Sequence, residues 1–548
     1  MRGLALYFNT VRYLRPVQVA GRLRMRWLVP RPDQRAAPQA RSPLEPYREP
    51  IASAPTLIGA DTFRFLGEQR RCLAAAGWQP PDAARLWVYN LHYFDDLNAH
   101  AAAARRPWHL ALLRRWVAEN PPARGPGWEP YPVSRRIVNW VKWAAAGNPL
   151  PESCRQSLAV QARWLRRRLE YHLLGNHLLA NAKALVYAGL YFEGDEADAW
   201  YVHGVDLFGR QIRQQILADG GHYELSPMYH AAVLEDLLDL TNILRSHGRI
   251  EPPLWRDAIE RMWGWLRIMS HPDGGISFFN DAAFGAAPTA AELGAYAARL
   301  GLPLACPVQA SLTVLEASGY VRLSSGCAQV LCDCARVGPD FLPGHAHADT
   351  LSFELSLGRQ RVLVNSGTSC YGTGPQRQRE RGTAAHNTVV VDAKDSSEVW
   401  GGFRVARRAR AQLLLLESGA HIVAEASHDG YRRLPGRNEH VRRWQLSPGR
   451  LEISDRVSPP FQDAVAHFHL HPQVSVDTRD GAEPGEPRLI LTVPGHGPVQ
   501  VAFEGAAAVK VADDAWHPYF GAAVPNKCLQ VRLAGPRLLT RLEWAEQA

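Results

Sequence analysis

The sequence predicts an α+β protein whose first half is helical and whose second half is an antiparallel β-sandwich. Its 548 residues exceed the size of one ordinary domain. Apolar residues recur at spacings of three and four as far as about residue 300, and from about residue 310 they gather in short β-branched runs. With 46% hydrophobic and 21% charged residues, the composition is that of a globular protein, not of a disordered or fibrous one.

Leucines and aromatic residues fill the apolar stripes of the first half, and short turns containing Gly, Pro or Asn separate them. Long helices joined by short turns predict antiparallel helix pairs. The segments with this period are 105–120, 134–147, 154–192 and 229–248.

Turn residues separate the β-branched runs of the second half at close spacing, which is typical of an antiparallel sandwich. The runs are 310–335, 360–368, 386–393, 421–434, 450–457, 488–495 and 528–535. We therefore predict an N-terminal extension at 1–57, a helical domain at 58–305 and a β domain at 306–548.

The formal charge of +9 comes almost wholly from arginine, whose planar fork matches carboxylate, sulfate or phosphate. An acidic partner that is not a nucleic acid is one interpretation, and coding bias is the other. The eight cysteines show no repeated spacing of a disulfide framework. Cys332 and Cys334 lie in a strand-like run, so we interpret them as packing residues instead of metal ligands.

Arginines interrupt the apolar residues of segment 1–30, which therefore lacks the continuous core of a secretory signal. This favours a cytoplasmic or membrane-associated location over a periplasmic one. A docked terminal helix is the preferred interpretation of the segment, and peripheral contact with an acidic membrane surface is the alternative.

Three titratable residues, His345, His347 and Asp349, occupy alternate positions before a strand-like run. Alternation is the strand period, so we expect their side chains on one face of a sheet. In the helical half, Asn176 and His177 interrupt a strongly apolar helix, with Asn181 about a turn further on. Either function or a hydrogen bond between helices would account for these buried polar groups.

A second polar motif, "DGGHYELSPMYH", contains a helix start at Ser226 and Pro227. Tyr229 follows in the first turn, where the helix dipole favours an anionic phenolate or substrate. Glu224 and His230 flank it, and the loop "PDGGISFFND" supplies Asp281.

Together these motifs resemble the heparinase II/III family of polysaccharide lyases. The matching pieces, in the family's order, are "GNHLLAN", "DGGHYELSPMYH", "PDGGISFFND", "GHAHADTLSFEL", "VLVNSGTSCYG" and "RGTAAHNTVVV". The resemblance implies an (α/α) toroid with a β-sandwich beside a cleft, cleavage of uronic-acid polysaccharides by β-elimination, and a structural metal, usually zinc.

The resemblance also assigns roles. Asn176 would neutralise the uronate carboxylate with His177 beside it, Tyr229 is the catalytic tyrosine, His345 is its partner, and Tyr371 is a second phenol candidate. A phenol of ordinary pKa is hardly ionised at pH 7, a handicap of about 4 kcal/mol for a base, so Tyr229 either has a lowered pKa or serves mainly as the acid. Candidate substrate-binding residues are Arg135, Asn139, Glu224, His230 and Asp281; an exposed helix face is the alternative for the first two.

The metal positions of the family match His347, Asn365 and His386, with Asn365 where aspartate is expected. A neutral amide oxygen is a poorer zinc ligand than a carboxylate. Either Asp349 or water completes the set, or the residues form a metal-free hydrogen-bond cluster.

We therefore expect a lyase that acts on an acidic polysaccharide in capsule or exopolysaccharide metabolism. A uronate C5-epimerase is the alternative enzyme, since it shares the proton-abstraction step. A glycan-binding protein with a decayed site is the third class.

Overall fold

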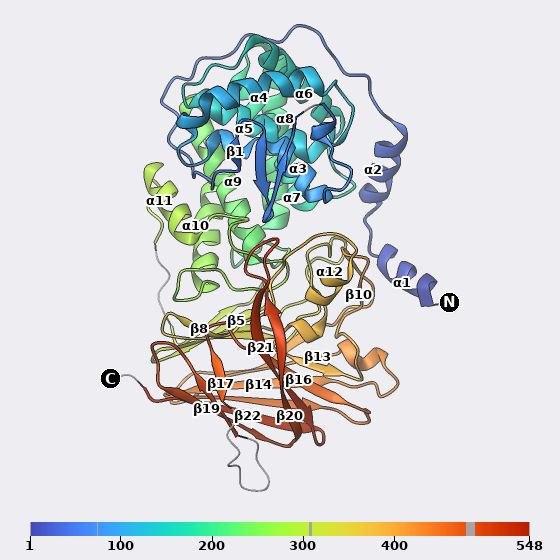
Figure 1. Cartoon of the computed structure of the whole chain (residues 1–548), viewed down its shortest axis with the longest axis vertical. Coiled ribbons are helices and arrows are strands. Elements are labelled where there is room, and N and C mark those ends of the chain that lie inside the picture. Colours follow the sequence, from blue (N-terminus) through green and yellow to red (C-terminus); the bar gives the residue numbers. More distant parts are fainter. Residues whose placement is uncertain (1, 74, 306–309, 478–487, 547–548) are drawn as a thin grey trace.

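The computed structural model describes residues 2–73, 75–305, 310–477 and 488–546 (Figure 1). Helices dominate the part of the chain before residue 300 and antiparallel sheets dominate the part after it, which confirms the α+β class. The predicted domain boundary at 306 and Cys306 fall outside the described residues. No helix within the described ranges combines the length and apolar character needed to cross a bilayer.

The α-helices are α1 (Arg2–Val11), α2 (Pro16–Trp27), α3 (Arg85–Tyr93), α4 (Arg106–Glu119), α5 (Pro130–Ala145), α6 (Glu152–Arg167), α7 (Gly175–Tyr191), α8 (Asp195–Gln215), α9 (Pro227–Ser246), α10 (Pro253–Ile268), α11 (Ala290–Arg299) and α12 (Pro375–Glu380). Helices α4 to α10 pack around one apolar core rich in tryptophan, including Trp116, Trp140, Trp200 and Trp255. The chain between α2 and β1 runs across this helical part, where the Arg41 N–H donates to the Tyr191 carbonyl over 2.7 Å.

Three sheets make up most of the second half. The five-stranded sheet has the order β4 (Leu312–Leu315), β5 (Tyr320–Ser325), β6 (Ala328–Asp333), β7 (Phe353–Leu357), β8 (Gln360–Leu363). The eight-stranded sheet has the order β12 (Ala411–Glu417), β13 (Ile422–His428), β14 (His440–Ser447), β15 (Arg450–Val457), β22 (Arg537–Glu543), β19 (Pro498–Glu504), β18 (Arg488–Thr492), β17 (Ser475–Asp477). The four-stranded sheet has the order β20 (Ala506–Trp516), β21 (Val524–Leu533), β16 (Ala464–His469), β9 (Val389–Val391).

These three sheets share one core, to which Val330 of β6, Trp444 of β14 and Phe468 of β16 all belong. Burial alternates strictly along β14, as expected for a strand with one face covered. Cys332 and Cys334 also pack in this core. A small hairpin, β10 (Val399–Trp400) with β11 (Arg404–Val405), stands apart from the large sheets.

The structure corrects three expectations about local structure. Segment 57–71, which apart from residue 57 belongs to the predicted helical domain, forms the antiparallel sheet β1 (Leu57–Gly59), β2 (Thr62–Phe65) and β3 (Glu68–Arg71). The predicted helical segment 154–192 forms two helices, because α6 ends at Arg167 and α7 begins at Gly175. Leu174, just before α7, and Gly175 itself have positive φ angles. Asn176 and His177 therefore lie in the first turn of α7, not inside a helix.

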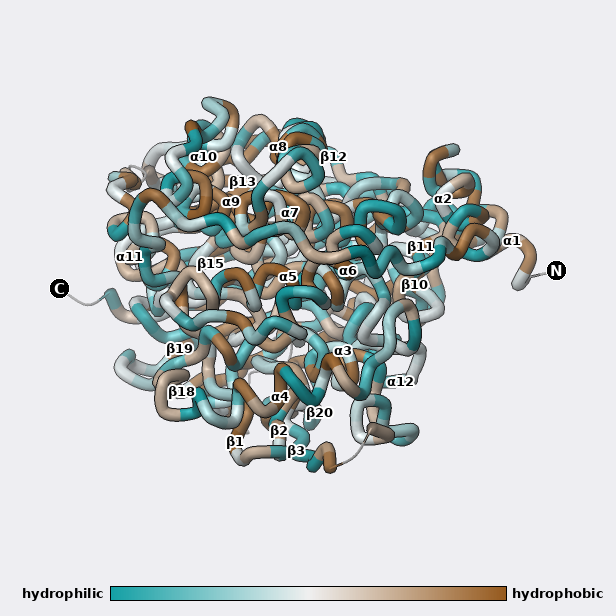
Figure 2. Tube along the Cα trace, turned by 90° about the horizontal axis from the view of Figure 1, so that it is seen from above, coloured by the Kyte–Doolittle hydropathy of each residue, from teal (hydrophilic) through white to brown (hydrophobic). Residues whose placement is uncertain are grey.

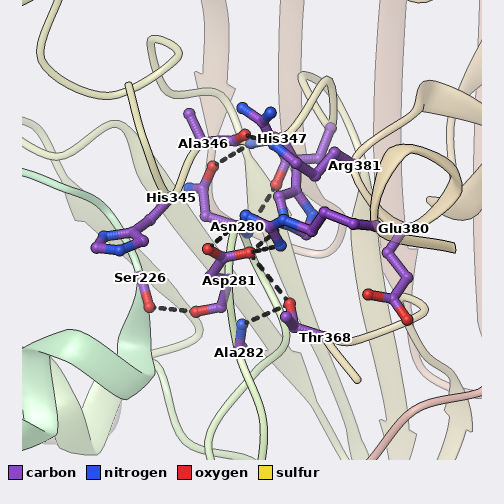
Figure 3. A network of polar contacts seen from close by, with 12 residues as sticks. Ser226, Asn280, Asp281, Ala282, His345, Ala346, His347, Thr368, Glu380 and Arg381 are labelled. Atoms are coloured by element: carbon purple, nitrogen blue, oxygen red, sulfur yellow. Dashed lines mark hydrogen bonds and ion pairs between the residues drawn. The ribbon is translucent and has the colours of Figure 1, made fainter. Parts of the chain in front are cut away.

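The third correction concerns the alternating residues His345, His347 and Asp349, which lie in a loop before β7 instead of on a strand. The loop backbone bonds to other loops: the His347 N–H donates to Asn280 Oδ1 over 3.0 Å, and the Ala348 N–H donates to the Arg381 carbonyl over 2.9 Å. Without a ladder to impose a period of two, the three side chains have different partners: His345 contacts Glu224, His347 contacts Asp281 and Asp349 contacts the Asn280 N–H. Figure 3 shows His345 and His347 pointing apart.

Candidate active site

The site lies where the first turns of α7 and α9 meet the loop that precedes β7. Ser226 caps α9 by accepting the Tyr229 N–H over 3.2 Å, and Pro227 follows at the first helical position, as predicted. Gly175 at the start of α7 lies so close to Glu224 and Leu342 that a Cβ there would come within 2.8 and 2.5 Å of their side chains. The Asn176 region, Glu224 and the loop are thus packed together.

Tyr229 and His345 form the centre of the site. Their rings stack with centroids 3.9 Å apart and planes 18° from parallel. The Tyr229 hydroxyl lies 2.7 Å from the Tyr371 hydroxyl, and the Tyr371 ring stacks at 6.1 Å from His345. The structure therefore brings one imidazole and two phenols from separate parts of the chain into direct contact.

Burial raises the pKa of Tyr229 well above its usual value, and the neighbouring Tyr371 raises it further. The pKa of Tyr371 is likewise raised by burial. Both phenols are therefore neutral at physiological pH. Of the two alternatives left open by the sequence, this geometry favours Tyr229 as a proton donor over Tyr229 as a base.

Glu224 lies behind His345. Its carboxylate accepts from His345 Nδ1, and its side chain is almost fully buried. Burial alone would raise the pKa of Glu224, but the adjacent imidazole outweighs this effect and lowers it. Because Nδ1–H faces the carboxylate, the neutral imidazole carries its lone pair on Nε2. Glu224 orients His345 and is not placed to bind substrate, which corrects that expectation.

His177 contacts two residues that were not predicted to belong to the site, Glu170 and Tyr131. Its Nδ1 lies 3.1 Å from Glu170 Oε1, and its ring lies 4.5 Å from that of Tyr131. Tyr131 occurs within the segment "PYPVSRRIVNW", in the first turn of α5 and one turn before Arg135. This position beside a predicted site residue is the sequence feature that could have identified Tyr131. The same contacts place α5 beside α7 at the site.

Burial separates the predicted site residues into two groups. The five residues predicted to be catalytic are partly exposed, and so is Arg135. The five are Asn176, His177, Tyr229, His345 and Tyr371. The other four residues predicted to bind substrate are buried: Asn139, Glu224, His230 and Asp281.

The buried residues have structural partners. His230 Nε2 bonds the Met262 carbonyl over 2.8 Å, and Asn139 Nδ2 donates to Asp95 Oδ1 over 2.6 Å. Arg135 also pairs with Asp95, at 3.1 Å. The substrate-binding expectation is therefore corrected for His230 and Asn139, and only Arg135 of this α5 pair has an accessible side chain.

Asp281 is the centre of a buried network that joins the helical and β parts (Figure 3). Arg377 of α12 holds it with two guanidinium bonds, His347 Nε2 lies 2.8 Å from Oδ1, and the Thr368 hydroxyl donates over 3.2 Å. Burial opposes its ionisation, yet Arg377 and His347 hold the pKa of Asp281 far below its usual value. Asp281 is thus a structural carboxylate, which corrects its substrate-binding assignment. Arg377 was missed because nothing in segment 375–381 distinguishes one of its three arginines.

Two of the three predicted metal ligands, His347 and His386, contact each other, and Asn365 bonds other residues. His347 Nδ1 lies 3.2 Å from His386 Nε2, and His347 Nε2 faces Asp281. Burial lowers the pKa of His347 to about 4 and that of His386 to about 3, so both rings are neutral. His347 then donates to Asp281 and accepts from His386. Asn365 Oδ1 accepts the Asn387 N–H over 3.1 Å.

This ligand set fits a tightly held zinc ion poorly, because it contains no carboxylate and only His386 Nδ1 among its ring nitrogens lacks a hydrogen-bond partner. Asp349, the alternative third ligand, instead accepts the Asn280 N–H over 2.9 Å. Neither histidine lies on a strand, contrary to expectation.

Within the described ranges, one group of three His, Cys, Asp or Glu side chains has metal-ligand geometry: His469, Asp514 and Cys528. The ring nitrogens of His469 bond Asp514 over 2.8 Å and the Ala384 carbonyl over 3.0 Å, and Arg379 pairs with Asp514. The ring nitrogens of His469 and the carboxylate of Asp514 therefore already have hydrogen-bond or ion-pair partners.

Both halves of the chain are similar to known proteins. Residues 104–296 match the family model for the heparinase II/III N-terminus, and residues 307–545 match that for the heparinase II/III-like C-terminal region. A solved structure of heparinase III superposes with a TM-score of 0.70 at 17% identity, covering 88% of this chain and 80% of that one. The two proteins therefore share a fold.

Two relatives of known name cover different shares of this chain, and only one of them is named as a lyase. A heparin-sulfate lyase of Bacteroides stercoris is 31% identical over 245 residues, which are 41% of this chain but only 37% of that protein. FtsZ-localized protein C of Caulobacter vibrioides is 26% identical over 499 residues, which are 84% of this chain and 82% of that protein.

Proposed function

Because this chain belongs to the heparinase II/III family, we propose that it is a polysaccharide lyase that cleaves a uronic-acid polymer by β-elimination. The stacked, partly exposed Tyr229 and His345 carry the proposal, since they supply a proton donor and a proton acceptor in contact with each other. The family's architecture, an (α/α) toroid beside a β-sandwich, is part of the proposal. So are an acidic polysaccharide as substrate and a role in capsule or exopolysaccharide metabolism.

Each residue has a role that follows from its position. His345 Nε2 takes the proton from the carbon beside the uronate carboxylate, and the C–H electron pair forms the new double bond as the glycosidic C–O bond breaks. Tyr229 gives its proton to the departing oxygen, and Tyr371, 2.7 Å away, can return one to it. Asn176 would donate to the carboxylate, where negative charge grows as the proton leaves.

The test is a panel of glucuronate, iduronate, galacturonate and mannuronate polymers, followed by the ultraviolet absorbance of an unsaturated product. A lyase produces that absorbance. A C5-epimerase instead exchanges the C5 proton with solvent without absorbance, and a glycan-binding protein does neither. Absence of unsaturated product on every polymer that the protein binds would contradict the proposal.

We expect Asn176→Ala to slow elimination far more than it weakens polymer binding, because the charge on the carboxylate develops mainly in the transition state. Comparison of single-turnover rates with equilibrium binding measures the two effects separately. Asn148→Ala, which removes an amide bonded to the Trp143 carbonyl at the end of α5, is the matched control and should change neither. Equal losses in rate and binding would make Asn176 a binding residue.

We further propose that zinc is held weakly or not at all, because two neutral imidazoles and an amide offer no negative charge to the ion. Purified protein should contain substoichiometric zinc that a chelator strips readily, or none. Asn365→Asp should raise zinc occupancy and melting temperature together, since a metal that binds only the folded state stabilises it. Elemental analysis and calorimetry check this. Full, chelator-resistant zinc in the unmodified protein would contradict it.

A further inference from the structure

The first two helices carry a one-sided charge that the proposed function does not use. Residues 1–32 contain seven arginines and no lysine, aspartate or glutamate, and Asp33 is the first acidic residue. Figures 1 and 2 show α1 and α2 standing out from the side of the body. Each helix nevertheless has a face fixed to the rest of the protein.

Helix α2 is docked through one face. Gln18 is buried and its amide donates to the Phe341 carbonyl over 3.1 Å. A Cβ on Gly21 would lie 2.8 Å from the His172 backbone, and Arg168 donates to the Met25 carbonyl over 3.1 Å. Positions 18, 21 and 25 share a helical face, so the opposite face of α2 is turned outward.

The outward face of α2 is apolar. Val19, Leu23 and Trp27 follow one another at a spacing of four, and at 100° per residue they lie opposite the docked face. Trp27 is 70% exposed. Arg22 and Arg26 fall on one flank of this stripe and Arg24 on the other, all three exposed. This is the pattern of a helix that lies in a membrane interface, with arginines reaching to the headgroups on both sides.

Helix α1 presents a similar face. Tyr7 and Thr10 hold it against the β10–β11 hairpin, with the Trp400 indole donating to Thr10 Oγ1 over 3.1 Å. Leu4, Phe8 and Val11, spaced four and three apart, remain exposed, and Phe8 is 66% exposed. Both helices therefore expose an apolar face.

The concentration of exposed apolar residues is specific to this segment. Within the described ranges, ten of the 19 large exposed hydrophobic side chains lie between Leu4 and Val29. A second copy of the same face would bring arginines against arginines with no acidic residue to pair them. An anionic lipid surface matches both the apolar residues and the charge.

We propose that α1 and α2 together form a surface that docks on an anionic lipid bilayer. The apolar residues of both helices enter the interface, and the flanking arginines bind lipid phosphate. The opposite faces of the two helices contact both parts of the protein. Helix α2 contacts His172 and Arg168 on the helical side, and α1 contacts Trp400 on the β side. Docking would therefore orient the whole molecule.

Vesicle sedimentation tests the proposal with the full chain. Vesicles of phosphatidylcholine mixed with phosphatidylglycerol should bind the protein at least roughly tenfold more tightly than vesicles of phosphatidylcholine alone, and added salt should weaken the binding. Equal binding to both vesicles, or binding to neither, would overturn the proposal.

The double variant Phe8→Asp, Trp27→Asp should lose at least about tenfold in vesicle binding, because each substitution puts a charge into the interface. The matched control is Val202→Asp, Ile250→Asp, which changes two apolar residues that are 63% and 91% exposed elsewhere, and it should bind as the unmodified protein does. Unchanged melting temperatures establish that both variants fold. Retained binding in the first variant would overturn the proposal, as would a dimer, seen by light scattering, that the same substitutions dissociate without any vesicle binding.

Discussion

Replacing Tyr229 by phenylalanine is expected to lower turnover of the cleaved polymer at least about a hundredfold, the usual scale for loss of a general acid. The ring stack on His345 stays in place, and only the hydroxyl bonded to Tyr371 is removed. The fold should therefore be kept. Initial rates of unsaturated-product formation, with calorimetry as the check on folding, measure the effect.

Two further phenols serve as comparisons. Tyr131→Phe removes a hydroxyl from a ring that contacts Tyr93 and His177, and we expect turnover within about tenfold of the unmodified enzyme. Tyr371→Phe removes the partner hydroxyl and should give an intermediate loss. Near-normal turnover in folded Tyr229→Phe would remove this phenol from the mechanism.

The largest loss of stability is expected at Asp455. Its carboxylate lies fully buried between β14 and β15, where Arg442 donates to both oxygens over 2.8 and 3.0 Å and His440 Nε2 lies at 2.7 Å. Asp455→Ala leaves the Arg442 charge buried without its carboxylate. We expect a decrease of about 3–5 kcal/mol in the free energy of unfolding, measured by chemical denaturation.

An exposed ion pair provides the control. Asp513 and Lys527 pair across β20 and β21, with 91% and 47% of their side chains exposed. Asp513→Ala should cost no more than about 1 kcal/mol, because water already screens the pair. Equal losses in the two variants would show that burial does not decide the effect.

The same carboxylate gives a pH dependence. Burial opposes ionisation of Asp455, but Arg442 and His440 outweigh it and lower its pKa from 3.8 to about 2. A depressed folded pKa contributes stability that is fully present above the unfolded value and is lost as the pH falls through the folded value. Unfolding free energy should therefore fall between about pH 4 and pH 2, and Asp455→Ala should reduce this slope.

Periodicity predicted the main elements because it reports directly which face of an element is covered. The segment 229–248 became α9 and the run 450–457 became β15 within two residues. Alternation alone misled at His345, His347 and Asp349, since a period of two has structural meaning only where a ladder imposes it. The loop backbone is bonded elsewhere, to Asn280 and Arg381.

The site was predictable to the extent that its residues lie in recognisable local motifs. Asn176, Tyr229 and His345 each occur in such a motif, and each is partly exposed. Glu224, His230 and Asp281 occur in the same motifs, yet all three are buried. Neighbours distant in sequence decide this burial: His345 covers Glu224, and Arg377 covers Asp281. Sequence motifs therefore predicted which residues gather but not which of them a substrate can reach.

The network around Asp281 limits how the protein can move. A hinge opening between the helical and β parts would expose Asp281, Arg377 and His347 and break their mutual bonds. Slow amide hydrogen exchange is therefore expected along 278–282, limited by global unfolding and not by local fluctuation. Tyr229 and His345 are held in register by this junction before any polymer arrives. The entropy of aligning them is lost once, during folding, and not in each catalytic cycle.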